Sequence, residues 1–373
     1  MYKNLAAALA AACFFSPAFS QTAATAAASA PAAAPVAAPL KVGFVYVTPV
    51  LEVGWTRQHD AGRRAVEAAL GTSVQTTRVE NVPEGADAER VVRELAATGH
   101  GLIFTTSFGY MESTLKVARD FPDVRFESIT GYRQADNVAT ANARYYEGRY
   151  LAGIAAGRMS TTGVAGYVAG FPIPEVLQGI NAFTLGMRSV RPKAVVRVVW
   201  LDSWFDAPRE REAAMALMDQ GADVLAFHTA TAAVVVAAQE RGKLAVAYHS
   251  DMRGVAPDAQ IVAVTHHWGN HYTQRARAVL DGSWKSGNVW GGVREGMVRV
   301  EGFGSKVPPA VQQEVLARQK DIGAGRLAPF RATQTALRDN TGREVLAPGQ
   351  ALSDAQILQM DWLVEGVQGR VAR

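Results

Sequence analysis

The sequence predicts an α/β protein made of two similar lobes in tandem, and three observations support this. From residue 41 onward, short β-branched runs alternate with longer segments of helical periodicity. This alternation is typical of a parallel sheet wound with helices. The alternating series runs once before residue 142 and again after it. The roughly 330 residues from Lys41 onward are enough for two domains, each with its own core.

Local signals place the individual elements. The first helix is expected over residues 58–70, because alanines recur on one face and Gly71 ends the pattern. The first series predicts strands at 41–47, 101–106 and 124–130 and helices at 58–70, 87–97 and 111–120. The second predicts strands at 163–168, 195–201, 223–227, 244–248 and 261–265, with helices at 147–159, 174–190, 208–220, 232–241 and 271–281. The less regular last quarter predicts a strand at 296–300 and helices at 310–323 and 353–364.

The first 20 residues are expected to be an export signal. Lys3 gives a short positive region, residues 5–15 are apolar, and Ala18-Phe19-Ser20 forms a small-x-small cleavage pattern. The apolar run is too short to span a membrane. Cys13 leaves a lipoprotein alternative open. Cleavage after Ser20 would remove this only cysteine, and disulfides and cysteine nucleophiles with it.

The segment 21–40 is expected to be a disordered tether. It consists almost entirely of Ala, Pro, Thr and Ser, a composition that cannot bury a core. We therefore expect folded structure to begin at Lys41.

Charge and motifs exclude several function classes. The formal net charge is +4 and the basic residues are interspersed with acidic ones, which gives no support to nucleic-acid binding. The sequence has no P-loop, HExxH, GxSxG or GxGxxG motif. The prediction is therefore a binding protein rather than an enzyme, without a cofactor or a metal.

The candidate site lies at the carboxyl ends of the strands, where open parallel sheets bind ligands. Taken singly, a Ser, Thr or Asp after a strand is more often a helix cap. The aromatic residues in these loops instead indicate a planar ligand stacked on a flat ring. The candidate ligand-binding residues are Trp55, Ser107, Phe108, Phe171, Asn181, Trp204, Phe205, Thr229, Asp251 and Trp268.

Histidines supply a competing interpretation. Five of them lie near predicted strand ends or loops, namely His228, His249, His266, His267 and His271. Imidazoles gathered in a cleft could hold zinc, as in a zinc receptor. Alternatively, they are hydrogen-bonded or solvated residues.

Several segments match a known family in order along the chain. They are Gly54-Trp55-Thr56 with His59, Glu80-Asn81-Val82-Pro83-Glu84-Gly85, Thr106-Ser107-Phe108-Gly109-Tyr110-Met111, Tyr146-Glu147-Gly148-Arg149-Tyr150-Leu151, Phe171-Pro172-Ile173-Pro174-Glu175-Val176, Trp204-Phe205-Asp206 and Met360-Asp361-Trp362-Leu363-Val364-Glu365-Gly366-Val367. From Lys41 to its end, the chain resembles the basic membrane protein family of ABC-transporter substrate-binding proteins. These are type I periplasmic binding proteins whose best-understood members bind purine nucleosides.

The resemblance implies ligand contacts at matching positions only. They are the first-loop aromatic Trp55, the pairs Ser107 with Phe108 and Trp204 with Phe205, and the acidic Asp251. Two departures weaken a ribose site. Trp268 stands where nucleoside-binding members have a lysine, and Ala230 stands where close relatives have an aspartate. We therefore expect a purine base or similar heterocycle rather than a nucleoside.

The resemblance also implies an architecture and a role. We expect two Rossmann-like lobes joined by a hinge of three crossovers, the first from 41–142 with 250–286 and the second from 143–249 with 287–373. Trp55, Phe108 and Trp204 would stack on the ring, while Ser107, Asn181, Thr229 and Asp251 would bond its edges. A periplasmic monomer would deliver the ligand to an ABC permease at the inner membrane. The alternatives are a zinc receptor using His228, His249 and His267, and a periplasmic nucleoside hydrolase.

Overall fold

The structure of the chain is a computed structural model that describes residues 11–16 and 38–371. The chain divides into two units, 1–38 and 39–373, and every helix and strand of the described residues belongs to the second. The predicted cleavage site after Ser20 and nearly all of the predicted tether lie outside the described residues. In the part of the chain that is described, no helix is long and apolar enough to cross a membrane.

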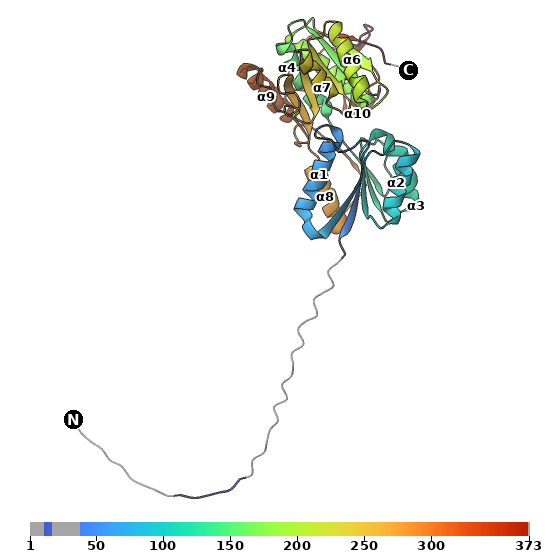
Figure 1. The fold of residues 1–373 in the computed structure, drawn as a ribbon, viewed down its shortest axis with the longest axis vertical. Helices are drawn as coiled ribbons and strands as arrows, with labels where there is room; N and C mark the ends of the chain where they lie inside the picture. Colours follow the sequence, from blue (N-terminus) through green and yellow to red (C-terminus); the bar gives the residue numbers. More distant parts are fainter. Residues whose placement is uncertain (1–10, 17–37, 372–373) are drawn as a thin grey trace, which may run out of the picture. The chain divides into compact units, whose positions relative to one another are not determined.

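The first lobe is a parallel sheet covered by helices on both faces. Its strand order is β11-β5-β4-β3-β1-β2, from Asn288–Gly291, Val138–Ala143, Arg125–Ile129, Leu102–Thr105, Leu40–Val45 and Val74–Val79. Figure 1 shows α1 (Trp55–Leu70) and α8 (Gly269–Leu280) on one face of this sheet, and α2 (Ala86–Ala97) and α3 (Met111–Asp120) on the other. This lobe contains a doubly wound arrangement, as the alternating pattern predicts.

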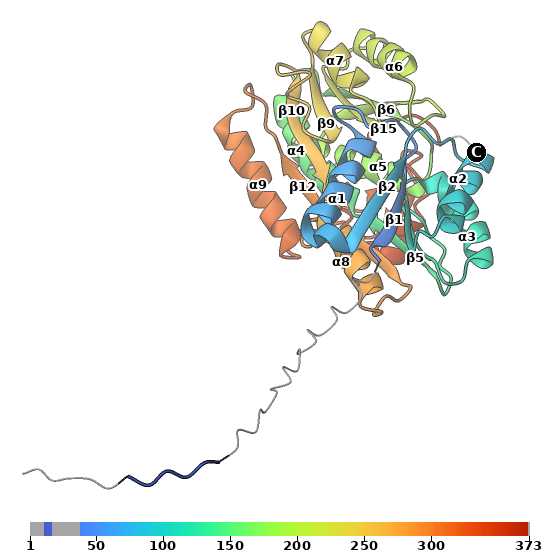
Figure 2. The ribbon, with the colours of Figure 1, turned by 60° about the horizontal axis from the view of Figure 1, so that its bottom comes forward.

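The second lobe repeats this plan. Its strand order is β12-β10-β9-β8-β6-β7-β15, from Val298–Glu301, Gln260–His266, Leu244–His249, Val224–His228, Val164–Ala169, Val195–Trp200 and Val367–Gln368. Every neighbouring pair is parallel except β12 with β10. The helices are α4 (Tyr145–Met159), α5 (Pro174–Val190), α6 (Ala207–Asp219), α7 (Ala233–Glu240), α9 (Pro309–Gly323) and the short α10 (Asp354–Leu358). A small antiparallel pair, β13 (Leu337–Arg338) with β14 (Glu344–Leu346), completes the elements. Figure 2 shows α9 at the outer edge of the lobe.

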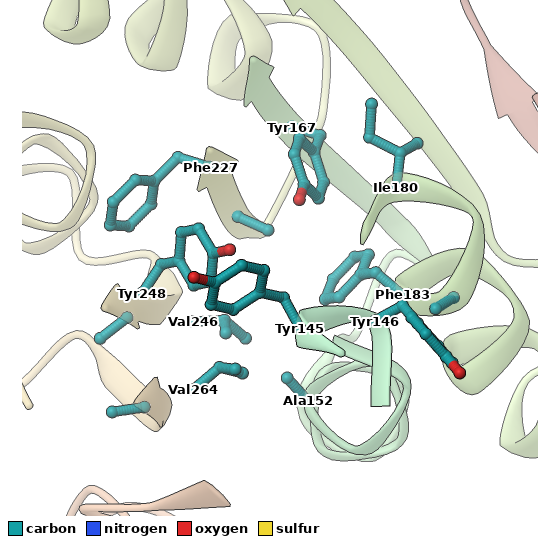
Figure 3. Packing of buried hydrophobic residues seen from close by; sticks show 14 of the residues in the cluster. Tyr145, Tyr146, Ala152, Tyr167, Ile180, Phe183, Phe227, Val246, Tyr248 and Val264 are labelled. Carbon is teal, nitrogen blue, oxygen red and sulfur yellow. The ribbon is translucent and has the colours of Figure 1, made fainter. Parts of the chain in front are cut away.

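The core of the second lobe contains several buried aromatic rings. Tyr145, Tyr167 and Tyr248 are fully buried together with Phe183, and Figure 3 shows their rings packed between α4, α5 and the sheet. Burial of each aromatic side chain contributes on the order of 2 to 3 kcal/mol. Burial also brings phenol hydroxyls into the interior, close to the carboxyl ends of the strands.

The chain crosses between the lobes three times in the described residues, between 143 and 145, between 266 and 269, and between 291 and 298. The crossings differ from the predicted boundaries in two places. The strand Gln260–His266, predicted with the first lobe, pairs with β9 of the second. The strand Asn288–Gly291, predicted with the second lobe, pairs with β5 of the first. Strand pairing is a tertiary property, and an apolar run does not specify which sheet it joins.

Two strands and one helix end could not be predicted from the local sequence. The strand Val74–Val79 lies at a sheet edge and only Val74 in it is buried. Val138–Ala143 contains three alanines and an asparagine, so that only Val138 and Thr140 favour a strand. The predicted helix 353–364 begins correctly, with a capping box between Ser353 and Gln356, but ends at Leu358. Beyond that point, backbone groups of residues 362–364 bond to Asn181 and Asn340 instead of continuing the helix.

The two lobes touch through backbone and side-chain hydrogen bonds. The Gly54 N–H of the first lobe donates to Ser250 Oγ of the second at 3.0 Å, and Gln58 Nε2 donates to the His249 carbonyl at 2.7 Å. A Cβ atom on Gly54 would lie 2.2 Å from the Ala230 carbonyl oxygen. The lobes are therefore in contact here, and only glycine at position 54 permits this approach.

We expect Gly54→Ala to hold the lobes apart, and Gly85→Ala is the matched control. Both glycines cap helices at positive φ (+102° and +89°), so both substitutions should cost about 1 to 3 kcal/mol in backbone strain. A Cβ on Gly85 meets nothing within 4 Å. Small-angle scattering should therefore give a larger radius of gyration for Gly54→Ala alone. Equal radii for the two variants would contradict this role of Gly54.

Candidate functional site

A cavity lies where the carboxyl ends of the two sheets face each other. It adjoins a wider, open hollow that shares Phe108, Thr130, Ile173 and Glu175 with it. Loops after strands of both lobes supply the lining. The lining residues are Val47, Trp55, Ser107, Phe108, Thr130, Ile173, Glu175, Trp204, His228, Thr229, Ala230 and His249.

Aromatic rings line much of this cavity or support the rings that do. The ring centroids of Phe171 and Trp204 lie 4.9 Å apart, those of Trp204 and His228 lie 6.2 Å apart, and those of Trp55 and His249 lie 5.4 Å apart. Phe108 stacks against Tyr132 at 5.6 Å. Such a wall presents flat apolar faces to a flat ligand.

Five of the predicted site residues come together at this cavity, namely Trp55, Ser107, Phe108, Trp204 and Thr229. Phe171 lies directly behind Trp204 and fixes its ring. The other four, Asn181, Phe205, Asp251 and Trp268, are not among the lining residues.

Trp268 is a core residue rather than a lining residue. It is 1% exposed, and its indole Nε1 donates to His266 Nδ1 at 2.7 Å. His266 Nε2 then faces His249 Nδ1 at 3.0 Å, and His249 Nε2 faces the Thr229 carbonyl at 3.1 Å. Because an indole only donates and a carbonyl only accepts, hydrogens run in one direction from Trp268 to Thr229. Both imidazoles are therefore neutral, with their hydrogens on Nε2.

Burial supports this assignment. It lowers the pKa of His266 and of His249 well below the ordinary value for histidine. A second proton on His266 would sit on Nδ1 and point at the indole N–H. The neutral chain thus fixes the orientation of His249 and of the Thr229 backbone, both of which line the cavity.

The remaining three displaced residues have structural contacts or lie at the surface. Asn181 Nδ2 donates to the Trp362 carbonyl at 2.8 Å, and its Oδ1 accepts from the Val364 N–H at 2.8 Å, which docks the C-terminal segment on α5. Asp251 pairs with Arg253 at 2.6 Å. Phe205 is 38% exposed. Asp251 and Phe205 follow strands, and a position after a strand does not determine where its side chain points. Asn181 lies inside α5, and its side chain bonds to the C-terminal segment instead of facing the cavity.

A buried acid organises the loops on the second lobe. Glu210 of α6 is fully buried and accepts from Thr229 Oγ1 at 2.8 Å and from Thr231 Oγ1 at 2.6 Å. Burial raises its pKa, while these two hydrogen bonds oppose the rise. The Ala230 N–H also donates to the Trp204 carbonyl at 2.9 Å. The loop bearing Trp204 and the loop bearing Thr229 therefore form one unit.

Two lining residues have left-handed backbones. Thr130 and His249 have φ of 63° and 69°, and neither is glycine. Such conformations cost on the order of 1 to 3 kcal/mol each and are enriched at ligand sites. Hydrogen bonds from Thr130 Oγ1 to the Ile129 carbonyl and from His249 to the Thr229 carbonyl stabilise them.

Sequence reasoning missed Glu175 as a site residue. It lies in the first turn of α5 after Pro174, a pattern that by itself indicates only a helix start. In the structure its Oε1 lies 3.3 Å from His228 Nε2, and its Oε2 accepts from Asn142 Nδ2 at 2.9 Å. Among the described residues that line the cavity, it is the only acid.

The candidate zinc histidines do not converge. His228 faces Glu175, His249 belongs to the neutral chain, and His267 Nε2 lies 3.3 Å from Glu301. Among residues 11–16 and 38–371, no three His, Cys, Asp or Glu side chains are arranged to hold a metal ion.

Replacing Trp268 with Phe should lower stability, because His266 Nδ1 would lose its indole donor. An unpaired buried polar group costs about 1 to 3 kcal/mol. Urea unfolding measures this difference. Trp200→Phe is the control, because it also removes an indole N–H, but one that donates to the Arg370 carbonyl in an exposed position. Equal losses in the two variants would argue against a special role of the chain from Trp268 to Thr229.

Comparisons with known proteins identify the family of the chain. Residues 40–328 match the family described as ABC transporter substrate-binding protein, PnrA-like. A purine-binding protein of Brucella abortus is 47% identical over 332 residues, which cover 89% of this chain and 94% of that protein. A protein of Haloferax volcanii, named as a putative ABC transporter glucose-binding protein, is 35% identical over 89% of this chain and 81% of its own length.

Solved structures support the fold. An ABC transporter solute-binding protein of Aeropyrum pernix has a TM-score of 0.65 at 18% identity and covers 78% of this chain and 93% of that one. Another, from Conexibacter woesei, has a TM-score of 0.63 at 20% identity over 78% of this chain and 98% of its own. The predicted fold class and the resemblance are both confirmed. The chain belongs to the PnrA-like family of ABC transporter substrate-binding proteins.

Proposed function

We propose that this receptor captures a purine base in the cavity between its lobes and delivers it to an ABC permease. The observation that carries the proposal is the lining itself, in which Trp55, Phe108 and Trp204 surround a space with one carboxylate, Glu175. A flat heterocycle uses aromatic faces for stacking and a small number of polar groups for orientation. The name of the Brucella abortus relative supports a purine as that heterocycle.

A base fits this site better than a nucleoside. Trp268 no longer bears on this choice, because its side chain is buried behind His266. Ala230 does line the cavity, and Asp251 is paired with Arg253 instead. Ribose oxygens would find few donors among the lining side chains, and an unpaired buried polar group costs about 1 to 3 kcal/mol.

The two alternatives have less support. The candidate zinc histidines each have a separate partner. The family and the Brucella abortus relative are named for binding, which favours capture over hydrolysis.

Delivery requires export. The N-terminal pattern of Lys3, an apolar run and Ala18-Phe19-Ser20 supports secretion to the periplasm, where a monomer would meet its permease. Closure around the ligand would exclude water and give the loaded form a shape that the permease can distinguish.

Calorimetric titration tests the ligand class. Adenine, hypoxanthine, adenosine and glucose should be compared side by side, and at least one free base should bind tenfold more tightly than adenosine. Tightest binding of adenosine would contradict the free-base proposal. Tightest binding of glucose would contradict the purine proposal as a whole.

Trp204→Ala should weaken binding of that base by about 1 to 3 kcal/mol, the scale of base stacking on an aromatic ring. Its side chain is only partly buried, so the empty protein should keep nearly all its stability. Trp200→Ala is the control, because Trp200 belongs to β7 and is absent from the cavity lining. Unchanged affinity in Trp204→Ala would remove this ring from the site.

A further inference from the structure

We infer that Glu175 makes the cavity selective for ligands that donate N–H hydrogen bonds, so that an amino group is preferred over a keto oxygen at the same ring position. This inference rests on the proposed capture of a purine base. Glu175 was not among the candidate residues from the sequence. Its position at the start of a helix does not mark it as a site residue either.

The hydroxyl groups that line the cavity have already used their hydrogens. Ser107 Oγ donates to Glu84 Oε1 at 2.6 Å, Thr130 Oγ1 donates to the Ile129 carbonyl at 2.6 Å, and Thr229 Oγ1 donates to Glu210 Oε2 at 2.8 Å. A hydroxyl carries a single hydrogen. These three side chains therefore offer a ligand only acceptor lone pairs.

The ring N–H groups are committed in the same way. Trp55 Nε1 donates to the Thr106 carbonyl at 2.8 Å, and the hydrogen of His249 goes to the Thr229 carbonyl. The Nε2 of His228 faces Glu175. Among the described residues of the lining, this leaves the indole N–H of Trp204 as the side-chain donor open to a ligand. The polar side chains of this cavity thus accept far more readily than they donate.

Glu175 is the strongest of these acceptors. Its side chain is 11% exposed, and each carboxylate oxygen receives one neighbour, His228 or Asn142. A carboxylate has about four lone-pair positions, so each oxygen retains capacity for one further donor. A charge-assisted hydrogen bond to that oxygen is about twice as strong as a neutral one.

A buried cation lies in the core of the lobe that carries Glu175. Arg149 is fully buried and, among the described residues, makes no ion pair. Its Nη2 donates to the Phe227 carbonyl, while its guanidinium carbon lies 3.3 Å from the centre of the Tyr248 ring, which Figure 3 shows beside Tyr145. The positive charge cannot be lost, because a guanidinium stays protonated in proteins.

The imidazole of His228 faces Glu175 through one ring nitrogen, Nε2, at 3.3 Å. Because a carboxylate only accepts hydrogen bonds, this contact favours a hydrogen on Nε2. Burial also lowers the pKa of His228, which keeps the ring neutral. The hydrogen on Nε2 therefore points at Glu175, which is left to accept.

Adenine and hypoxanthine present the two alternatives at one ring carbon. The two bases differ at ring carbon 6 and in the hydrogen on N1 of hypoxanthine. In the pose that directs the carbon-6 substituent at Glu175, the amino group of adenine donates to the carboxylate, whereas the keto oxygen of hypoxanthine would face a carboxylate and hydroxyl lone pairs. Leaving such an oxygen unpaired in a buried site weakens binding by about tenfold or more. We therefore expect adenine to bind at least tenfold more tightly than hypoxanthine.

Glu175→Gln tests this specificity, because the amide adds an N–H donor and removes the charge. Calorimetry should show weaker adenine binding and an adenine-to-hypoxanthine affinity ratio that falls to within about threefold of one, since the amide can pair with either group. Glu212→Gln, an exposed change on α6, should leave the ratio unchanged. Glu175→Asp keeps the charge, so it should retain the preference for adenine even if its affinity is lower.

The outcomes separate this inference from the proposed function. Equal wild-type affinities for the two bases, or an unchanged ratio in Glu175→Gln, would overturn the inference while the purine proposal stands. A parallel loss of both bases would show that Glu175 only supports the fold, and would also overturn it. If Glu175→Gln does not fold, loss of the adenine preference in the folded Glu175→Asp variant would overturn it. Wild-type protein that binds no purine would overturn both proposals.

Discussion

The structure depends on one constraint, that polar groups buried between the lobes must find partners inside the protein. Trp268, His266, His249 and Thr229 satisfy it as a single chain of donors and acceptors. Glu210 satisfies it for the neighbouring loops. Because these internal bonds use the hydrogens of Thr229 and His249, the polar side chains that line the cavity are left mainly as acceptors. The hydrogen bonds that hold the cavity walls in place therefore also determine which polar side chains a ligand can use.

Closure and recognition share residues. Glu175 of the second lobe accepts from Asn142, which belongs to the last strand of the first lobe before a crossing. Gly54 allows the loop before Trp55 to reach Ala230, and both Trp55 and Ala230 line the cavity. A ligand that engages Glu175 therefore acts on a contact between the lobes. A ligand shifts an open form toward a closed one only if it binds the closed form more tightly. A contact that exists only when the lobes meet can provide that difference in affinity.

The fold could be predicted because hydrophobic periodicity encodes it directly, and Trp55, Ser107, Phe108, Trp204 and Thr229 could be placed because they follow strands. The pairing of Gln260–His266 and Asn288–Gly291 could not, since it depends on tertiary contacts. Trp268 and Asp251 also follow strands, yet their side chains turn away from the cavity. Glu175 carries the ordinary signature of a helix start, and only the tertiary fold brings it to His228 at the end of β8.

The most direct test is a crystal structure of the protein grown with adenine. We predict the base in the cavity between the lobes, with a ring face on Trp204 or Phe108 and an N–H group within hydrogen-bonding distance of the Glu175 carboxylate. A base bound outside this cavity, or bound inside it with no N–H group directed at Glu175, would contradict this mode of recognition.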